Sequence, residues 1–161
     1  MSTVNTTPNI SPGMVVQVVS SLTTAVATGT TVIPHDDSIP QNTEGNQFMT
    51  LAITPQSATN ILVIEALVYM SNSVAGHLIA ALFQDTTAGA LAVGDVFEAT
   101  ATAEDMVPVR HTMAAGTTSA TTFKIRAGGN NAGTTTFNGF SAGRAFGAIT
   151  KSSIVIWEYK A

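Results

Sequence analysis

The chain has 161 residues and no cysteine, so it is long enough for one hydrophobic core and can form no disulfide or thiolate site. Only 10% of its residues are charged, against roughly 25% in an ordinary soluble domain, and the net charge is -4. This composition excludes a basic surface for nucleic acid. A surface so poor in charge also indicates that partner subunits cover part of it.

The first 13 residues predict an extended arm, because they hold Pro8, Pro12 and Gly13 and show no apolar period. They contain no Lys or Arg and no apolar core segment, so they do not match an export signal. No apolar run reaches the roughly 18 residues of a membrane span. We therefore expect an arm at residues 1–13, one domain at residues 14–161, and no membrane contact.

Short apolar runs separated by turn residues predict an all-β domain. The runs cover residues 14–19, 30–33, 47–53, 61–70, 77–84, 90–97, 106–114, 121–127, 134–137 and 153–159. Such spacing is typical of an antiparallel sandwich or barrel. Residues 95–106 carry several acidic side chains and fit either one short helix or an acidic loop.

Two glycine-containing segments predict turns. Residues 85–89 lie between two apolar runs and fit a hairpin loop in which Gly89 takes a positive φ. Residues 127–133 are too rich in glycine and asparagine for a regular strand, so we expect a longer turn there.

The run at residues 61–70 is largely apolar on both alternating faces, with Glu65 as its one charge. A strand that is apolar on both sides is buried on both sides. Two interpretations stay open. Either one face meets the core and the other meets a neighbouring subunit, or a loop of the same chain covers the second face.

Gly139 to Gly143 match the G-x-S-x-G pattern that carries the nucleophile of serine hydrolases, with Ser141 in the centre. That chemistry needs an acid and then a histidine later in the chain, and no histidine follows His111. We expect a tight corner of small residues instead.

The remaining candidates for chemistry are weak. His35, Asp36 and Asp37 have metal-binding side chains, but adjacent residues of an extended segment point in alternate directions, so we expect a solvated turn. His77 and His111 fit ordinary strand positions. The acidic residues Glu98, Glu104 and Asp105 more simply solvate one polar stretch than catalyse glycoside hydrolysis. We therefore predict no enzyme, no cofactor and no metal.

Four segments, taken in order, carry a resemblance. They are GMVVQVV at 13–19, LAITPQSATNILVI at 51–64, AGTTSATTFKIRA at 115–127 and SSIVIWEY at 152–159. Together they resemble a family of bacteriophage virion proteins, which are small domains found as tail-fibre heads, head fibres and capsid decoration proteins. The resemblance implies an antiparallel jelly-roll β-sandwich of the tumour-necrosis-factor type that assembles as a homotrimer.

The resemblance implies a virion structural protein, and we expect capsid decoration because a tail-fibre head usually follows a long shaft, whereas only about a dozen residues precede the domain here. A trimer would bind the outer capsid surface, with other copies of this chain and the major capsid protein or other virion proteins as partners. It would be made in the host cytoplasm and end on the exterior of the virion. We expect Val4, Pro8, Ile10 and Pro12 of the arm to anchor it.

The alternative is a receptor-binding head of a tail fibre or tail tip. Phe137, Phe140 and Arg144 could then contact a host glycan or surface protein, unless the phenylalanines fill the core instead. A small enzyme on the same fold is a third possibility, although no convergent acid, base and electrophile can be named.

Overall fold

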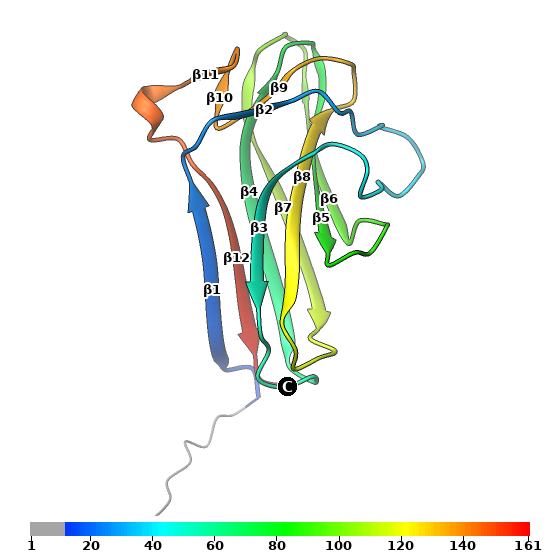
Figure 1. The fold of residues 1–161 in the computed structure, drawn as a ribbon, viewed down its shortest axis with the longest axis vertical. Coiled ribbons are helices and arrows are strands. Elements are labelled where there is room, and N and C mark those ends of the chain that lie inside the picture. The colour runs from blue at the N-terminus through cyan, green and yellow to red at the C-terminus, as the bar shows by residue number, and fades with distance from the viewer. Residues whose placement is uncertain (1–11) are drawn as a thin grey trace, which may run out of the picture.

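The computed structural model describes residues 12–161, whose main strands form two sheets packed face to face (Figure 1). The elements in chain order are β1 (Val15–Thr23), β2 (Ala27–Gly29), β3 (Asn46–Ile53), β4 (Ile61–Asn72), β5 (Gly76–Gln84), β6 (Ala92–Glu98), β7 (Glu104–Ala114), β8 (Thr121–Gly129), β9 (Thr135–Phe137), β10 (Gly139–Phe140), β11 (Gly143–Arg144), the 3-10 helix η1 (Phe146–Ala148) and β12 (Ser152–Tyr159). No helix among residues 12–161 is long and apolar enough to cross a membrane.

The first sheet is built around β4, its longest strand. β7 pairs with β4 along one edge, and β12 pairs with the other edge and is followed outward by β1. Beyond the stretch of β4 that pairs with β12, β9 pairs with the same edge of β4, and β2 pairs with β9. Every pairing is antiparallel. Hydrophobic residues dense in β-branched side chains suit these strands, because such side chains pack well on a pleated surface.

The second sheet has the order β3-β8-β5-β6, again antiparallel throughout. The segment between β2 and β3 crosses its outer side. There Ile33 is buried with Ile79, Ala81 and Phe83, in a small cluster separate from the main core. This segment, at residues 30–45, therefore acts as a cover for one face of the second sheet, and it projects to the right in Figure 1.

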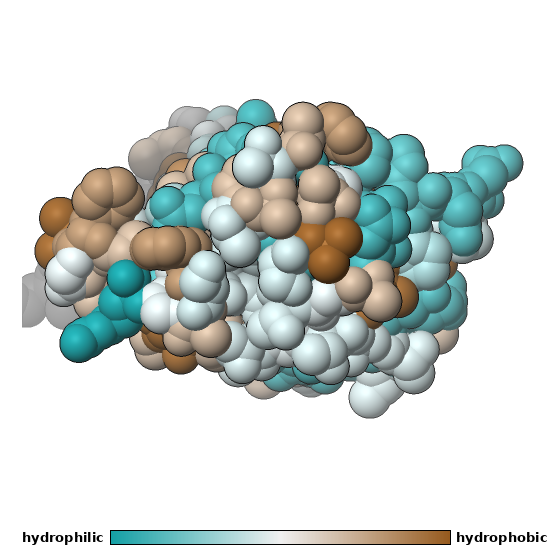
Figure 2. Space-filling view, turned by 90° about the horizontal axis from the view of Figure 1, so that it is seen from above, coloured by the Kyte–Doolittle hydropathy of each residue, from teal (hydrophilic) through white to brown (hydrophobic). Residues whose placement is uncertain are grey.

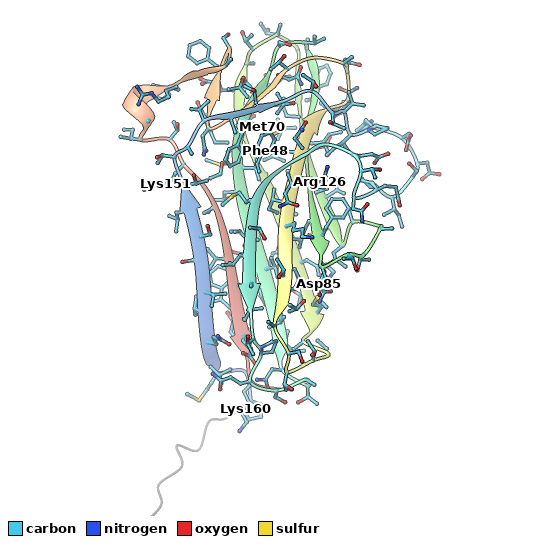
Figure 3. All side chains as sticks on the ribbon, viewed as in Figure 1. Phe48, Met70, Asp85, Arg126, Lys151 and Lys160 are labelled. Atoms are coloured by element: carbon cyan, nitrogen blue, oxygen red, sulfur yellow. The ribbon has the colours of Figure 1, made fainter. Side chains whose placement is uncertain are left out.

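The main core lies between the two sheets. Side chains alternate along each strand, so even-numbered positions of β4 enter the core and odd-numbered ones point away. The largest fully buried core side chains are Leu62, Ile64, Met70, Leu78, Leu82, Phe123, Ile125, Ile154 and Ile156. Phe48 stacks on Phe137 with ring centroids 4.9 Å apart and closes the upper part of the core (Figure 3).

Several local expectations change. Residues 30–33 form no strand, because Ile33 is buried as part of the cover and not as part of a ladder. No helix forms over residues 95–106, which instead contain the end of β6, a turn and the start of β7. The hairpin between β5 and β6 is present, but Asp85, at a φ of 49°, takes the positive φ that we expected of Gly89.

The glycine-rich segment is also more regular than expected, since β8 continues through Gly128 and Gly129. Glycine is needed there for close approach. A Cβ on Gly128 would lie 2.6 Å from the carbonyl oxygen of Thr31, and one on Gly129 would lie 2.4 Å from Asn72 Nδ2. The turn is limited to residues 130–134.

Candidate functional site

The predicted anchoring residues of the arm fall mostly outside the structure. Val4, Pro8 and Ile10 lie outside the described residues, and Pro12 is exposed at the start of the described chain. The chain enters the sandwich beside its own C-terminus, because Gly13 N–H donates to the carbonyl of Lys160 (2.7 Å) and Lys160 N–H donates to that of Met14 (2.9 Å). Lys160 marks this end of the molecule in Figure 3.

The largest candidate surface is the side of the first sheet that points away from the core. We call it the apolar face, and its members are Val18, Leu22, Val63, Leu67, Tyr69, Met106, Pro108, Val155 and Trp157. The strand register lines them up in rows. One row runs Val18, Trp157, Val63, and the next apolar row runs Leu22, Ser153, Leu67, Pro108.

Most of these side chains are exposed or half-buried. Leu67 in the middle of the sheet is 45% exposed, and Leu22 on the edge strand is more exposed still. Within the described chain, no loop or helix packs on the apolar face as residues 30–45 do on the second sheet. A contiguous apolar surface of this kind is typical of an interaction site.

A charged pair interrupts the apolar face. Arg110 Nε on β7 lies 3.2 Å from Glu65 Oε1 on β4, its direct cross-strand neighbour. Both side chains are largely exposed, so this pair adds only about 0–1 kcal/mol to stability. Its consequence is electrostatic: the two charges neutralise each other and leave the face suited to an apolar partner.

The second candidate surface is the end of the sandwich that carries β10, β11 and η1. β10 and β11 form a two-residue hairpin in which Ser141 and Ala142 both have positive φ, 48° and 60°. A Cβ on Gly139 would lie 1.9 Å from the carbonyl oxygen of Gly143, which explains the small residues. The G-x-S-x-G match is therefore a tight hairpin, which is the corner that we expected, and not a strand-to-helix nucleophile turn.

The structure separates the three residues named for distal-loop binding. Phe140, 44% exposed, and the exposed Arg144 lie on the hairpin. Phe137 is only 2% exposed and packs in the core, so solvent and ligand cannot reach it. This is a correction for Phe137: all three residues of β9 are buried, and its ring stacks on Phe48.

Exposed apolar side chains that sequence reasoning missed extend this surface. Phe146 is 73% exposed and Ile149 is 74% exposed, and both follow the hairpin directly. Figure 2 looks down on this end of the molecule. Hydrophobic residues gather at the left over the hairpin and η1, and hydrophilic ones at the opposite side. A hollow of about 310 Å³ lies beside the hairpin, lined by Ser73, Thr102, Thr134, Thr136, Ser141 and Ala142.

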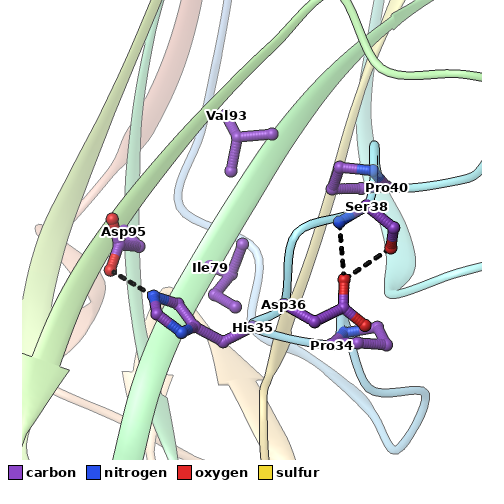
Figure 4. Close-up of a pocket in the computed structure, with 8 residues that line it drawn as sticks. All are labelled: Pro34, His35, Asp36, Ser38, Pro40, Ile79, Val93 and Asp95. Carbon is purple, nitrogen blue, oxygen red and sulfur yellow. Dashed lines mark hydrogen bonds and ion pairs between the residues drawn. The ribbon is translucent and has the colours of Figure 1, made fainter.

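A third constellation was not foreseen. His35 of the cover, His77 of β5 and Asp95 of β6 converge, with His77 Nδ1 2.8 Å and His35 Nε2 3.8 Å from Asp95 Oδ2. Figure 4 shows the contact between His35 and Asp95. The two imidazole rings stack with centroids 3.8 Å apart. His35 and Asp95 border a hollow of about 260 Å³. The sequence analysis treated these residues separately because they lie in three different segments.

The other titratable candidates do not join this cluster. The pKa of Asp36 is held below its usual value, first by the Ser38 hydroxyl and then by the Ser38 backbone N–H, which both donate to its carboxylate. Asp37 is exposed. His111 lies on β7, and the acidic residues Glu98 and Glu104 begin or end different strands.

Comparison with known proteins adds a family and a fold. A family model described as the Pgp3 C-terminal domain matches residues 31–161. Comparison with curated protein sequences gives no match. Among solved structures, the chain is similar to Eiger TNF from S. frugiperda, with a TM-score of 0.55 and 9% identity over 89% of this chain and 94% of that chain.

Two viral structures are also similar, and this chain spans less than half of each. Infectious bursal disease virus of the Gt strain has a TM-score of 0.41 and 13% identity over 100% of this chain and 43% of that chain. The VP2 subviral particle of the same virus has a TM-score of 0.38 and 12% identity over 90% and 38%. The tumour-necrosis-factor-like jelly roll expected from the sequence is confirmed. The bacteriophage part of the resemblance stays a prediction.

Proposed function

We propose that this chain, which belongs to the Pgp3 C-terminal domain family, is a structural virion protein, a homotrimeric jelly roll that decorates the outer surface of a phage capsid. The family match does not itself point to a capsid, so the proposal rests on the surface of the molecule. The observation that carries this proposal is the apolar face. A sheet side with this many uncovered apolar residues needs a partner, and the partner that we assign is another copy of the same chain, because only 10% of its residues are charged and an apolar face on each copy can cover the other.

Trimer formation would supply the mechanism of attachment. Gly13 is bonded at the end of the sandwich where the C-terminus lies, so the arm of each subunit would start from that end. Three arms held by one trimer bind the shell together, and this multivalency raises the affinity about 10²–10⁴-fold over that of a single arm. Val4, Pro8, Ile10 and Pro12 are the proposed anchors on the capsid.

The test is retention by virus shells that lack the protein. Purified chain is mixed with such shells and, separately, with host cells, and the bound fraction is measured after sedimentation. We expect retention on shells at a stoichiometry that follows shell symmetry. Deletion of residues 1–12 should abolish retention, whereas Phe140→Ala, at the opposite end of the sandwich, should retain it.

Two results would overturn the decoration role. The first is a wild-type chain that sediments with cells and not with shells. The second is a deletion of residues 1–12 that leaves occupancy of the shells unchanged, which would remove the arm as anchor.

A second candidate function rests on the exposed aromatic end. Phe140 and Phe146 stand next to Arg144 and beside the hydroxyl-lined hollow, which is a combination suited to stacking on a sugar and donating hydrogen bonds to it. The corresponding role is a receptor-binding head for a host glycan or surface protein. Cell retention that is lost in the double variant Phe140→Ala, Arg144→Ala and kept in Val74→Ala, an exposed position in the loop between β4 and β5, would support it.

A further inference from the structure

We propose that His35, His77 and Asp95 form a binding site for a divalent transition metal, and that the ion is Zn²⁺. Each residue offers one ligand atom, and the three atoms lie within 4.8 Å of one another. Two imidazoles with one carboxylate are a donor set that suits zinc, whereas magnesium and calcium prefer oxygen ligands alone. This inference does not depend on the capsid role proposed above.

Two of the ligands are fixed by the β5–β6 hairpin. His77 pairs with Phe97, and Ile79 pairs with Asp95, so His77 and Asp95 are diagonal neighbours on the same face of the second sheet. The position of His77 is fixed further, because its backbone N–H donates to Asn130 Oδ1 at 2.7 Å. The ring of Phe97 packs at a tilt against the His77 ring, with centroids 5.2 Å apart.

The third ligand comes from the cover. Ile33, two residues before His35, is fully buried, and its N–H donates to the carbonyl of Gly129 at 3.1 Å. A second bond ties the two ends of the cover, since Gly45 N–H donates to the carbonyl of Val32 at 2.9 Å. His35 is thereby held over the sheet at the point where it can stack on His77.

The distances between the ligand atoms are compatible with a bound metal. Ligand atoms around a tetrahedral zinc lie roughly 3.3 Å apart, given metal–ligand distances of about 2.0–2.1 Å. The contacts to Asp95 Oδ2, at 2.8 Å from His77 and 3.8 Å from His35, lie on either side of that value. A metal would replace the His77–Asp95 hydrogen bond. Because the two rings stack at an interplanar angle of 16°, the exposed His35 side chain would also have to turn out of the stack so that its Nε2 lone pair points at the ion.

The fourth coordination position of the metal would face solvent. The hollow of about 260 Å³ that His35 and Asp95 border is lined on its other sides by Pro34, Ser38, Pro40, Ile79 and Val93 (Figure 4). Asp36 also borders it, but its carboxylate accepts hydrogen bonds from Ser38. Three protein ligands plus water is the arrangement of zinc sites that keep one exchangeable position. The bound ion would also link the cover to β5 and β6, which stabilises the folded chain.

The experiment uses the full chain without an affinity tag, stripped of metal with a chelator and titrated with Co²⁺ and then Zn²⁺ alone. The visible absorption of bound Co²⁺ and competition with a chromogenic zinc chelator report binding. We expect one ion per chain. Asp95→Asn and His35→Asn, both at exposed positions where folding is unaffected, should weaken Zn²⁺ binding by more than about tenfold.

The matched control is His111→Asn, which removes the remaining histidine from the other sheet and should leave the affinity unchanged. Thermal unfolding with excess Zn²⁺ gives an independent reading, with a rise in Tm for the wild type and for His111→Asn only. A wild type that binds no ion, a variant Asp95→Asn that binds as tightly as wild type, or a control that loses binding equally would each overturn the proposal.

Discussion

Glu158 lies fully buried in β12, and its carboxylate joins segments that are far apart in the chain. Its Oε1 accepts hydrogen bonds from the backbone N–H of Gln56 at 2.8 Å and from Asn60 Nδ2 at 2.6 Å. Gln17 of β1 donates to Oε2 at 2.9 Å in the amide orientation that satisfies both of its ends. One side chain thus ties β12 to β1 and to the turn before β4.

We expect Glu158→Ala to lower the free energy of unfolding by about 3 kcal/mol, because several buried donors lose their acceptor at once. Urea denaturation monitored by circular dichroism measures the change. Asp37→Ala removes the same charge from an exposed position and should shift stability by no more than about 0.5 kcal/mol. Equal urea midpoints of unfolding for the two variants would show that the hydrogen bonds of Glu158 do not stabilise the fold.

Tyr69 supplies a prediction about pH. Burial raises the pKa of Tyr69 to about 12, and the neighbouring Glu104 carboxylate adds to the rise. Since this pKa lies above the ordinary value of 10.0, the group contributes stability that is fully present below about pH 10 and is lost as the pH rises through about 12.

The chain has two tyrosines, so Tyr159→Phe leaves Tyr69 as the only one. Absorbance at alkaline pH in this variant should show a midpoint of about 12. Adding Glu104→Gln should move the midpoint downward, because a carboxylate charge is removed. A midpoint at the ordinary value in the single variant would contradict the assignment.

Among the elements, the cover depends on glycine in β8. A Cβ on Gly128 would lie 2.6 Å from the carbonyl oxygen of Thr31, and the nearest atoms all belong to backbone that cannot move aside cheaply. We expect Gly128→Ala to cost roughly 1–3 kcal/mol of stability by overpacking. In the same variant, Zn²⁺ binding should weaken, since the cover carries His35. Gly143→Ala is the control, as its Cβ would make only ordinary contacts at 3.4 Å or more.

The strands could be predicted from sequence better than the cover. Short apolar runs bounded by turn residues locate β3, β4, β5 and β7, because each of these strands contributes side chains to the core. Residues 30–33 have the same apolar composition, but Ile33 is buried against the outer side of a sheet. The local pattern of apolar residues does not distinguish a strand that pairs within a sheet from a segment that lies across the outer side of one.

The sequence contains a feature that could have predicted part of the cluster of His35, His77 and Asp95. A hairpin loop at residues 85–89 is centred on Thr87, and a centre at Thr87 pairs residue 79 with residue 95 and residue 77 with residue 97, as observed. His77 and Asp95 could therefore have been placed on one face from the loop alone. His35 could not, because its position depends on how a long segment folds back over the sheet, which is a tertiary effect.

The whole molecule has two sheets with different surroundings. The second is covered by residues 30–45, which bury Ile79, Ala81 and Phe83 on its outer side. The first presents the apolar face without such a cover among the described residues. This asymmetry favours the first of the two interpretations of β4 that the sequence left open, in which the second face of the strand meets a neighbouring subunit.

If the proposed trimer forms through the apolar face, a charge placed on that face should dissociate it. Leu67 lies centrally, between Ser153 of β12 and Pro108 of β7, so Leu67→Glu would bury a carboxylate without a partner in any subunit contact across this face. We expect the wild type to sediment as a trimer in analytical ultracentrifugation and Leu67→Glu to sediment as a folded monomer. The matched control is Val74→Glu, because Val74 is similarly exposed, at 41%, but lies in a loop away from the face.

The control should remain trimeric, which separates an effect of position from an effect of added charge. A monomeric wild type would contradict assembly through the apolar face. A Leu67→Glu variant that stays trimeric would place the subunit contact elsewhere on the molecule. The same variant also tests attachment, because three linked arms bind far more strongly than one: if Leu67→Glu is monomeric, its retention on shells should fall together with its oligomeric state, although its arm is intact.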